Sequence, residues 1–140
     1  MENYIENAEN LLVKAVERCC NVKEIGLIFS SGLDSAIIGV LASRFTKVSA
    51  YTVGLIDSSD IESAKKIQNY IDFHIEIIEM DKYDVENSLK PILSAIKEPN
   101  PLKVSVGVPF YIASKKANKD NLEVMLCGQG GDELFGGYNR

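Results

Sequence analysis

A loop of small and polar residues has the composition needed to bind an anion and a metal ion together. Residues 30–35 read Ser-Ser-Gly-Leu-Asp-Ser and lie between a short apolar run and a segment with helical periodicity. Small residues let backbone amides approach an anion, and the N–H groups at a helix N-terminus favour negative charge. Asp34 would repel a phosphate unless a cation lay between them, and Mg²⁺ prefers carboxylate and phosphate oxygens. The loop therefore predicts a phosphate site with Mg²⁺, in which Ser30, Ser31 and Ser35 offer hydroxyl donors.

Helix capping is the alternative explanation for this loop. Asp and Ser are preferred N-cap residues, so Asp34 or Ser35 would then only cap the following helix. The loop is not a Walker-type P-loop, because it has neither the G-x-x-x-x-G-K-S/T spacing nor its lysine. At this point phosphate binding is favoured and capping remains open.

A second loop, near the C-terminus, combines glycines with two carboxylates. Residues 127–140 read Cys-Gly-Gln-Gly-Gly-Asp-Glu-Leu-Phe-Gly-Gly-Tyr-Asn-Arg, with five glycines between positions 128 and 137. Such glycines indicate unusual backbone angles or close approach to a ligand. A simple turn explains the glycines but not the acidic pair, so Asp132 and Glu133 are candidates for a second cation ligand.

The two loops together resemble the asparagine synthetase family. The first is similar to the S-G-G-x-D-S pattern of PP-loop ATP pyrophosphatases, with Ser31 in place of the first Gly. The second is similar to the family signature G-E-G-x-D-E-L/V-F-G-G-Y, with Gln129 in place of the Glu. Residues 51–54 (Tyr-Thr-Val-Gly) and 98–99 (Glu-Pro) also match, so the resemblance covers the chain from about residue 20 onward.

The resemblance implies an ATP-dependent reaction. Family members bind ATP with Mg²⁺, adenylate a small carboxylate such as aspartate and release pyrophosphate, after which ammonia displaces AMP. Among the matched residues, Asp34, Asp132 and Gln129 are implied to take part in catalysis. The matched binding positions are Phe29, Val53, Cys127 and Gly128 for the nucleoside, Ser30, Ser31, Gly32 and Ser35 for the pyrophosphate, and Asp34 and Asp132 for Mg²⁺.

Two features separate the chain from a full family enzyme. The amide of Gln129 cannot act as a base or carry charge, so the substrate or the second step is expected to differ. The chain stops at Arg140, just after the signature, so a protein partner or a homo-oligomer is expected to complete the acceptor site. Glu2 follows Met1 where family glutaminases have a cysteine, so residues 1–140 are expected to form one domain without a glutaminase.

Two alternatives to an AMP-forming ligase remain. One is a non-catalytic ATP- or AMP-binding module of the same superfamily, which Gln129 and the short C-terminus favour. The other, a tRNA-thiolating or lysidine-forming PP-loop enzyme, shares only the first loop. The acidic net charge of −5 opposes the tRNA substrate of such an enzyme, the absence of paired cysteines opposes sulfur transfer, and the second-loop signature is not shared with it.

Alternating β-rich and helical segments are expected to position both loops. They predict an α/β fold, a doubly wound parallel sheet with helices on both faces in three layers. Ligands bind such sheets at the carboxyl ends of the strands, where strand order reverses. The loops follow the first and fourth predicted strands, so we expect them to meet. Strands are predicted at 24–29, 47–53, 74–79 and 122–126, and helices at 5–19, 35–43, 61–71, 84–96 and 109–118.

Local signals and composition complete the prediction. Ser59 and Glu62 have the spacing of a capping box, and Pro109 suits the first turn of a helix. The hydrophobic fraction of 46% and charged fraction of 25% are those of a globular domain. No apolar run reaches the roughly 20 residues needed to cross a bilayer, and no secretory signal is visible, so a cytoplasmic location is expected.

Overall fold

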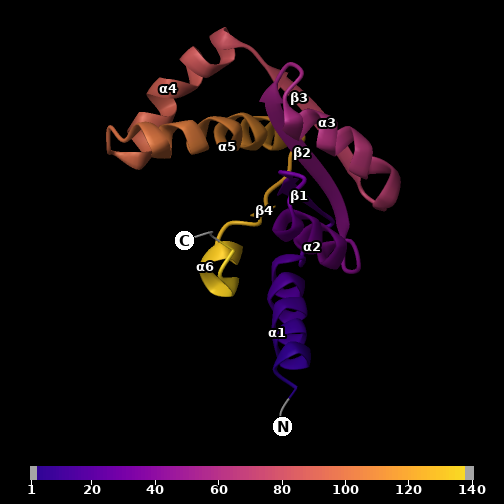
Figure 1. Cartoon of the computed structure of the whole chain (residues 1–140). Coiled ribbons are helices and arrows are strands. Elements are labelled where there is room, and N and C mark those ends of the chain that lie inside the picture. Colours follow the sequence, from indigo (N-terminus) through magenta and orange to yellow (C-terminus); the bar gives the residue numbers. More distant parts are fainter. Residues whose placement is uncertain (1–2, 138–140) are drawn as a thin grey trace.

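Four parallel strands and six α-helices make up residues 3–137, the part of the chain that the computed structural model describes (Figure 1). Within this range no helix is long and apolar enough to cross a membrane. The elements are α1 (Tyr4–Cys19), β1 (Glu24–Ile28), α2 (Leu33–Ala42), β2 (Lys47–Leu55), α3 (Ser59–Ile67), the 3₁₀ turn η1 (Gln68–Tyr70), β3 (His74–Met80), α4 (Lys82–Ile96), α5 (Pro101–Lys119), β4 (Met125–Cys127) and α6 (Gly131–Phe135).

The strand order confirms the predicted doubly wound sheet. The strands lie in the order β3-β2-β1-β4, and every pairing is parallel. β1 therefore has β2 on one side and β4 on the other, which is where the strand order reverses. In the register of these pairs, Ile28 at the carboxyl end of β1 lies opposite both Tyr51 and Cys127.

One face of the sheet carries the larger core. Ile25, Leu27 and Phe29 alternate along and just after β1, and all are at most 1% exposed. They pack with residues of α1, α2 and α3, and the Phe29 ring contacts Phe73 edge-on at 5.8 Å between centroids. Side chains alternate across a strand, so the neighbouring positions of β1 must face the other layer.

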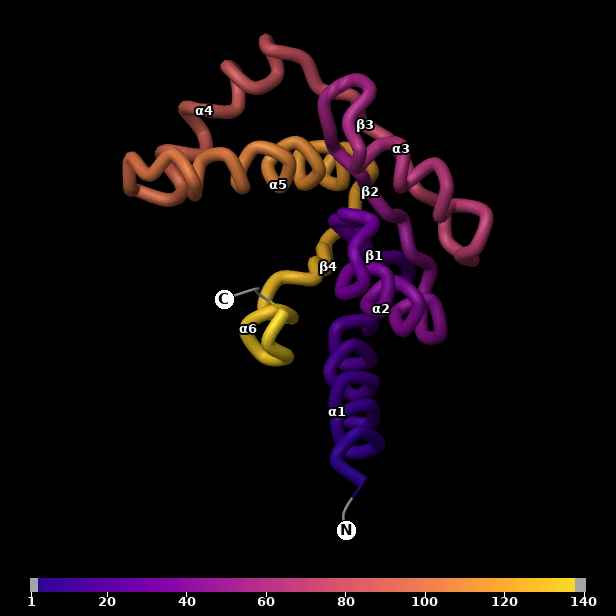
Figure 2. Tube along the Cα trace, viewed as in Figure 1, coloured from indigo at the N-terminus to yellow at the C-terminus, as the bar shows by residue number. Residues whose placement is uncertain are grey.

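The opposite face is covered by α5. Ala113 and Ala117 of α5 are buried against Tyr51, whose side chain points to this face. Small residues on the helix allow it to lie close to the sheet. α4 packs mainly on α5, and the two helices converge on the loop that joins them, at the end of α5 that is remote from the sheet (Figure 2). Helices on both faces confirm the three-layer arrangement.

A polar network fastens the end of α5 to the sheet. The Tyr51 hydroxyl donates to Asp120 Oδ2 at 2.6 Å, and Lys116 Nζ donates to Asp120 at 2.7 Å and to Glu76 at 2.7 Å. The Lys116 hydrogen bond, and then that of Tyr51, lower the pKa of the Asp120 carboxyl. Hydrogen bonds to Asp120 and Glu76 raise the pKa of Lys116. The network therefore stabilises the charged forms of both groups.

Two local predictions were wrong. The predicted capping box of Ser59 and Glu62 does not form, because the N-cap of α3 is Ser58 and its side chain makes no capping hydrogen bond. A capping box does occur at α4, where Asp81 and Asp84 exchange side-chain-to-backbone bonds.

Pro109 lies in the interior of α5 rather than in a first turn. The helix begins two turns earlier, because Asn100 accepts from the amides of Leu102 and Lys103, and Pro101 at the first helical position lacks only an N–H that would be unpaired there.

Candidate functional site

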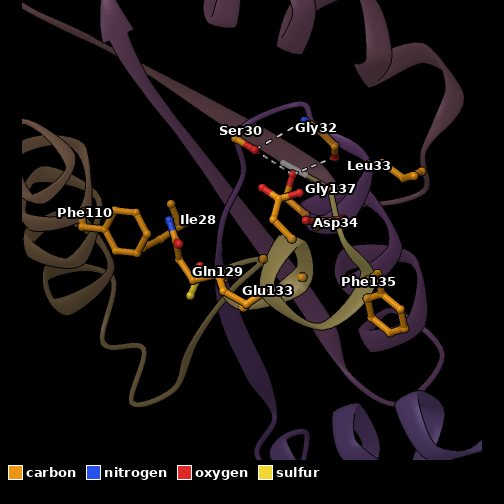
Figure 3. A pocket seen from close by; sticks show the side chains of 16 residues that line it. Ile28, Ser30, Gly32, Leu33, Asp34, Phe110, Gln129, Glu133, Phe135 and Gly137 are labelled. Atoms are coloured by element: carbon orange, nitrogen blue, oxygen red, sulfur yellow. Dashed lines mark hydrogen bonds between the residues drawn. The ribbon is translucent and has the colours of Figure 1, made fainter. Parts of the chain in front are cut away.

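The loops that follow β1 and β4 face a common cavity of about 560 Å³ (Figure 3). Ile28 and Cys127, paired in register at the strand ends, both line it. The cavity therefore lies at the carboxyl edge of the sheet, at the reversal of strand order, as the sequence predicted. Eight of the predicted site residues line it, namely Ser30, Gly32, Asp34, Ser35, Cys127, Gly128, Gln129 and Asp132.

The first loop presents the N-terminus of α2 to this cavity. Ser35 Oγ donates to the Gly32 carbonyl at 3.0 Å and lies 3.2 Å from Ser30 Oγ. The Gly32 amide points to Ser30 Oγ at a longer 3.4 Å. These bonds hold the loop closed around the first turn of a ten-residue helix, whose early N–H groups have no intrahelical acceptor. The arrangement suits an anion at the helix N-terminus.

The capping explanation for this loop is wrong. The N-cap of α2 is Gly32, and no side chain caps the helix. Asp34 lies in the first turn, and Figure 3 shows its carboxylate in the cavity, between Phe110 on one side and Phe135 on the other. The Asp34 carboxylate does not cap the N-terminus of α2, and it is therefore available to a ligand.

Ser31 differs from its neighbours in conformation and direction. Its φ of 61° lies in the left-handed region, where a side chain costs energy and glycine does not. Ser31 does not line the cavity, and its Oγ is buried without a hydrogen-bond partner within the described chain. Its hydroxyl is therefore not placed as the expected phosphate donor.

The second loop packs directly against Asp34. A Cβ at Gly128 would lie 3.0 Å from both Asp34 Cβ and the Ser35 amide nitrogen. A Cβ at Gly131 would overlap the Asp34 carboxylate itself. Gly130 between them has φ 96°. Glycine is required here for close approach at Gly128 and Gly131, and for backbone conformation at Gly130.

A short helix carries the acidic pair of the second loop. α6 begins at Gly131, so Asp132 and Glu133 lie in its first turn and line the cavity. The chain then folds back, because Gly136 has φ 75° and a Cβ at Gly137 would overlap the Asp132 carboxylate. The sequence predicted the unusual backbone angles and close approach at these glycines, but it did not predict this helix. Tyr138, the last residue of the signature, and Arg140 lie outside the described residues.

The cavity is rich in negative charge. Asp34, Asp132 and Glu133 line it, and no Lys, Arg or His of residues 3–137 does. Those residues contain no cluster of three or more His, Cys, Asp or Glu side chains able to hold a metal ion alone. Mg²⁺ is commonly bound by one or two carboxylates together with substrate phosphates and waters. The donor set of two aspartates beside a helix N-terminus fits that arrangement.

The two halves of the site come from segments almost a hundred positions apart, and comparison with known proteins identifies their family. The model of the asparagine synthase family matches residues 7–140. The chain belongs to the asparagine synthase family.

Relatives of this family span far more than the chain. A Methanocaldococcus jannaschii protein named as a glutamine-hydrolysing asparagine synthetase is 36% identical over 140 residues, which cover 99% of the chain and 25% of that relative. The chain therefore spans about a quarter of the length of this asparagine synthase relative.

Solved structures agree with the PP-loop fold of the family. The ammonia-dependent NAD synthetase of Campylobacter jejuni superposes with a TM-score of 0.62 at 15% identity, covering 96% of the chain and 60% of that protein. The glutamine-dependent NAD⁺ synthetase of Acinetobacter baumannii, solved with ADP, has a TM-score of 0.56 at 18% identity and covers 91% and 26%. At these identities the likeness concerns the fold.

Two residues predicted to lie near a nucleoside line a separate side cavity. Phe29 and Val53 line a pocket of about 110 Å³ at the ends of β1 and β2. The Phe29 side chain belongs to the core and is 1% exposed, while its carbonyl accepts from Thr52 Oγ1 at 2.8 Å. The Phe29 ring is therefore packed in the core and is not exposed to a ligand.

Sequence reasoning missed several residues that line these cavities. Phe110 follows Pro109 in α5 and lines both of them, and Asp60 of α3 lines the smaller one. A helical periodicity predicted from residue 101 would have placed Phe110 on the sheet-facing side with Ala113 and Ala117. No signal in the linear pattern indicated Asp60, because acidic residues in a first helical turn are common.

Proposed function

We propose that this domain binds ATP with Mg²⁺ and transfers its AMP moiety to a small carboxylate, releasing pyrophosphate. The observation that carries the proposal is the convergence of Asp34 and Asp132, from two loops, on one cavity beside the N-terminus of α2. ATP use also agrees with the family and with the ADP complex of an NAD⁺ synthetase of the same fold.

In this proposal the first loop binds the departing phosphates. The N–H groups at the start of α2 and the hydroxyls of Ser30 and Ser35 would donate to the β- and γ-phosphate oxygens, and Gly32 would let the chain approach them. For this the Ser35 hydroxyl would turn from the Gly32 carbonyl, to which it donates in the structure. Bound Mg²⁺ would neutralise charge on the leaving pyrophosphate. Asp34 and Asp132 would hold that ion between them. Ser31 contributes through its main chain only, since its side chain lies outside the cavity.

The nucleoside would extend from the phosphates toward the ends of β1 and β2. Cys127 and Gly128 line the large cavity, while Val53 and the main chain at Phe29 line the side cavity that adjoins it. Ile28, Ser30 and Phe110 line both, so the two cavities are neighbours, and the proposal requires one ligand to extend from one into the other.

The reaction would proceed by attack of the acceptor carboxylate on the α-phosphorus. A new O–P bond forms, the bond from the α-phosphorus to the bridging oxygen breaks, and pyrophosphate leaves with the electron pair. An amine then displaces AMP and forms an amide, as in an AMP-forming amide ligase. Gln129 lines the cavity and is positioned to hydrogen-bond the acceptor, but its amide cannot accept the proton of the amine.

A second candidate function is nucleotide binding without turnover. Gln129 favours it, because the amide removes a base, and the cavity walls built from residues 3–137 offer no cation for an anionic acceptor. A protein partner or a second copy supplying the acceptor site is also part of the proposal. A cytoplasmic location remains a prediction, and no nucleic-acid or membrane partner is proposed.

Pyrophosphate release from Mg-ATP tests the proposal. We expect release that depends on an added carboxylate and falls by roughly 100-fold or more in Asp34→Asn and in Asp132→Asn, because charge on the leaving group is no longer neutralised. Asp72→Asn, an exposed carboxylate between η1 and β3, is the matched control and should leave the rate unchanged.

The same assay separates the two candidates. Tight binding of ATP or AMP without acceptor-dependent pyrophosphate, across a panel of amino acids and with a complete family relative as positive control, would select the binding module. Acceptor-dependent release at equal rates in the wild type and Asp34→Asn would contradict the role of Asp34, and failure of the wild type to bind either ATP or AMP would contradict both candidates.

A further inference from the structure

The side cavity at the ends of β1 and β2 is lined mainly by apolar surface. Ile28, Val53, Pro109 and Phe110 contribute apolar surface to it, and its volume is about 110 Å³. It shares Ile28 and Phe110 with the large cavity that faces the two loops. A narrow apolar slot beside a phosphate site suits the planar base of a nucleotide better than its sugar, which carries hydroxyl groups.

Among residues 3–137, Asp60 is the only charged residue that lines this slot. It lies in the first turn of α3, directly after the carboxyl end of β2. Within residues 3–137 no hydrogen bond or ion pair involves its side chain.

The other polar side chains of the slot are already engaged. Thr52 donates to the Phe29 carbonyl at 2.8 Å, and Tyr51 donates to Asp120 at 2.6 Å. Ser30 Oγ lies 3.2 Å from Ser35 Oγ in the first loop, where the proposed function assigns it to the phosphates. The Asp60 carboxylate is thus the uncommitted side-chain acceptor at the slot.

We propose that Asp60 determines base specificity by accepting a hydrogen bond from the exocyclic amino group of adenine. This inference rests on the proposed function, since it requires ATP in the site. An ionised carboxylate only accepts hydrogen bonds, so it attracts an amino group and repels a carbonyl oxygen at the same ring position. Asp60 would therefore favour ATP over ITP, in which an oxygen replaces that amino group.

Asn at position 60 supplies the discriminating variant. An amide of the same shape both donates and accepts, so Asp60→Asn can pair with either ring substituent. We expect the ratio of the Kd for Mg-ITP to the Kd for Mg-ATP to fall about tenfold or more in Asp60→Asn, as expected for loss of a charge-assisted hydrogen bond. Both ligands are titrated calorimetrically into the same preparation, so any inactive fraction cancels from the ratio.

Glu62→Gln is the matched control, because it removes the same charge from the same helix at a residue outside both cavities. Its ratio should equal that of the wild type. A purely structural role for Asp60 at the helix N-terminus would lower stability in Asp60→Asn and leave the ratio unchanged.

Three results would overturn the inference. An unchanged ratio in Asp60→Asn, with wild-type Mg-ATP binding intact, removes the role of Asp60 and leaves the proposed function standing. A changed preference for ATP over 2′-deoxy-ATP, in place of ATP over ITP, assigns the carboxylate to the ribose. Failure of the wild-type chain to bind Mg-ATP overturns the proposed function and this inference together.

Discussion

Single residues in the two loops show why small side chains occur where they do. At position 31 the backbone has φ 61°, which glycine adopts freely and serine does not. The family pattern that the loop resembles has glycine there, and the structure gives the reason. Ser31 carries two costs, a strained backbone and a buried hydroxyl with no partner in the described chain.

Replacement of Ser31 by glycine is predicted to stabilise the domain. Relief of left-handed strain and of an unpaired buried hydroxyl each contributes of order 1 kcal/mol, and the extra freedom of glycine in the unfolded chain offsets part of this. We expect the free energy of unfolding in urea to rise by about 1 kcal/mol. Ser43→Gly is the control, because Ser43 has φ −62° and its hydroxyl donates to Val40, so it should lose stability. A loss in both variants would contradict the strain argument.

Close packing of Gly131 on Asp34 leads to a second prediction. A methyl group at position 131 would overlap the Asp34 carboxylate and displace it. We expect Gly131→Ala to weaken Mg-ATP binding by roughly tenfold or more, measured by calorimetry, because a misplaced ligand group loses its geometry. Gly107→Ala also meets a close neighbour, with Ile92 Cγ2 at 2.9 Å, but neither Gly107 nor Ile92 lines the two cavities. Gly107→Ala should lower the free energy of unfolding without changing Mg-ATP affinity. Equal Mg-ATP affinities in Gly131→Ala and Gly107→Ala would refute the role of Gly131.

Among the elements, α5 depends on a pH-sensitive attachment to the sheet. Asp120 lies at the C-cap of α5, where the helix dipole disfavours a negative charge, and Lys116 and Tyr51 offset this. These bonds lower the pKa of Asp120 below its unfolded value. Their contribution to stability is therefore fully present above the unfolded pKa and is lost as pH falls through the lower folded pKa.

Asp120→Asn is expected to remove this pH dependence. Relative to the wild type, the variant should be less stable at pH 7, and the difference should shrink as pH falls below about 4, where the unfolded carboxyl is protonated. Urea unfolding between pH 2.5 and pH 7 measures the difference. Asp72→Asn, at an exposed residue in the turn before β3, should give a flat difference. If the difference in the free energy of unfolding between wild type and Asp120→Asn grew as pH falls, the prediction would be contradicted.

The same scale shows what the linear pattern could and could not predict. The strands and their parallel arrangement followed from apolar runs separated by helical periodicity, because a buried parallel strand must be apolar on both faces. The start of α5 was missed, because Pro109 was interpreted as its first turn, whereas the helix begins at Pro101 with Asn100 as its N-cap. α6 was missed because a glycine-rich segment has no helical propensity of its own. Its position depends on packing against Asp34, which only the fold supplies.

At the scale of the whole molecule, the site joins the first strand to the last. The site residues were predictable because each loop combines small residues with a carboxylate. That the two loops lie side by side depends on the pairing of β4 with β1. Asp60 could not be predicted in the same way, because its place in the side cavity depends on how α3 and α5 flank the sheet. A ligand held by both loops must couple segments far apart in the chain.

Amide hydrogen exchange tests this coupling directly. Mg-ATP at 100 times its Kd should stabilise the fold by about 2.7 kcal/mol, and local opening at either loop must first release the ligand. We expect exchange at residues 32–35 and 128–131 to slow together, while α4 (Lys82–Ile96), which lines neither cavity, changes only to the extent of global unfolding. In Asp132→Asn the protection should disappear from both loops, although only the second is altered, because the shared ion joins them. Protection that persists at residues 32–35 in this variant would mean that the first loop binds the phosphates alone, and that the two aspartates do not act on one ion.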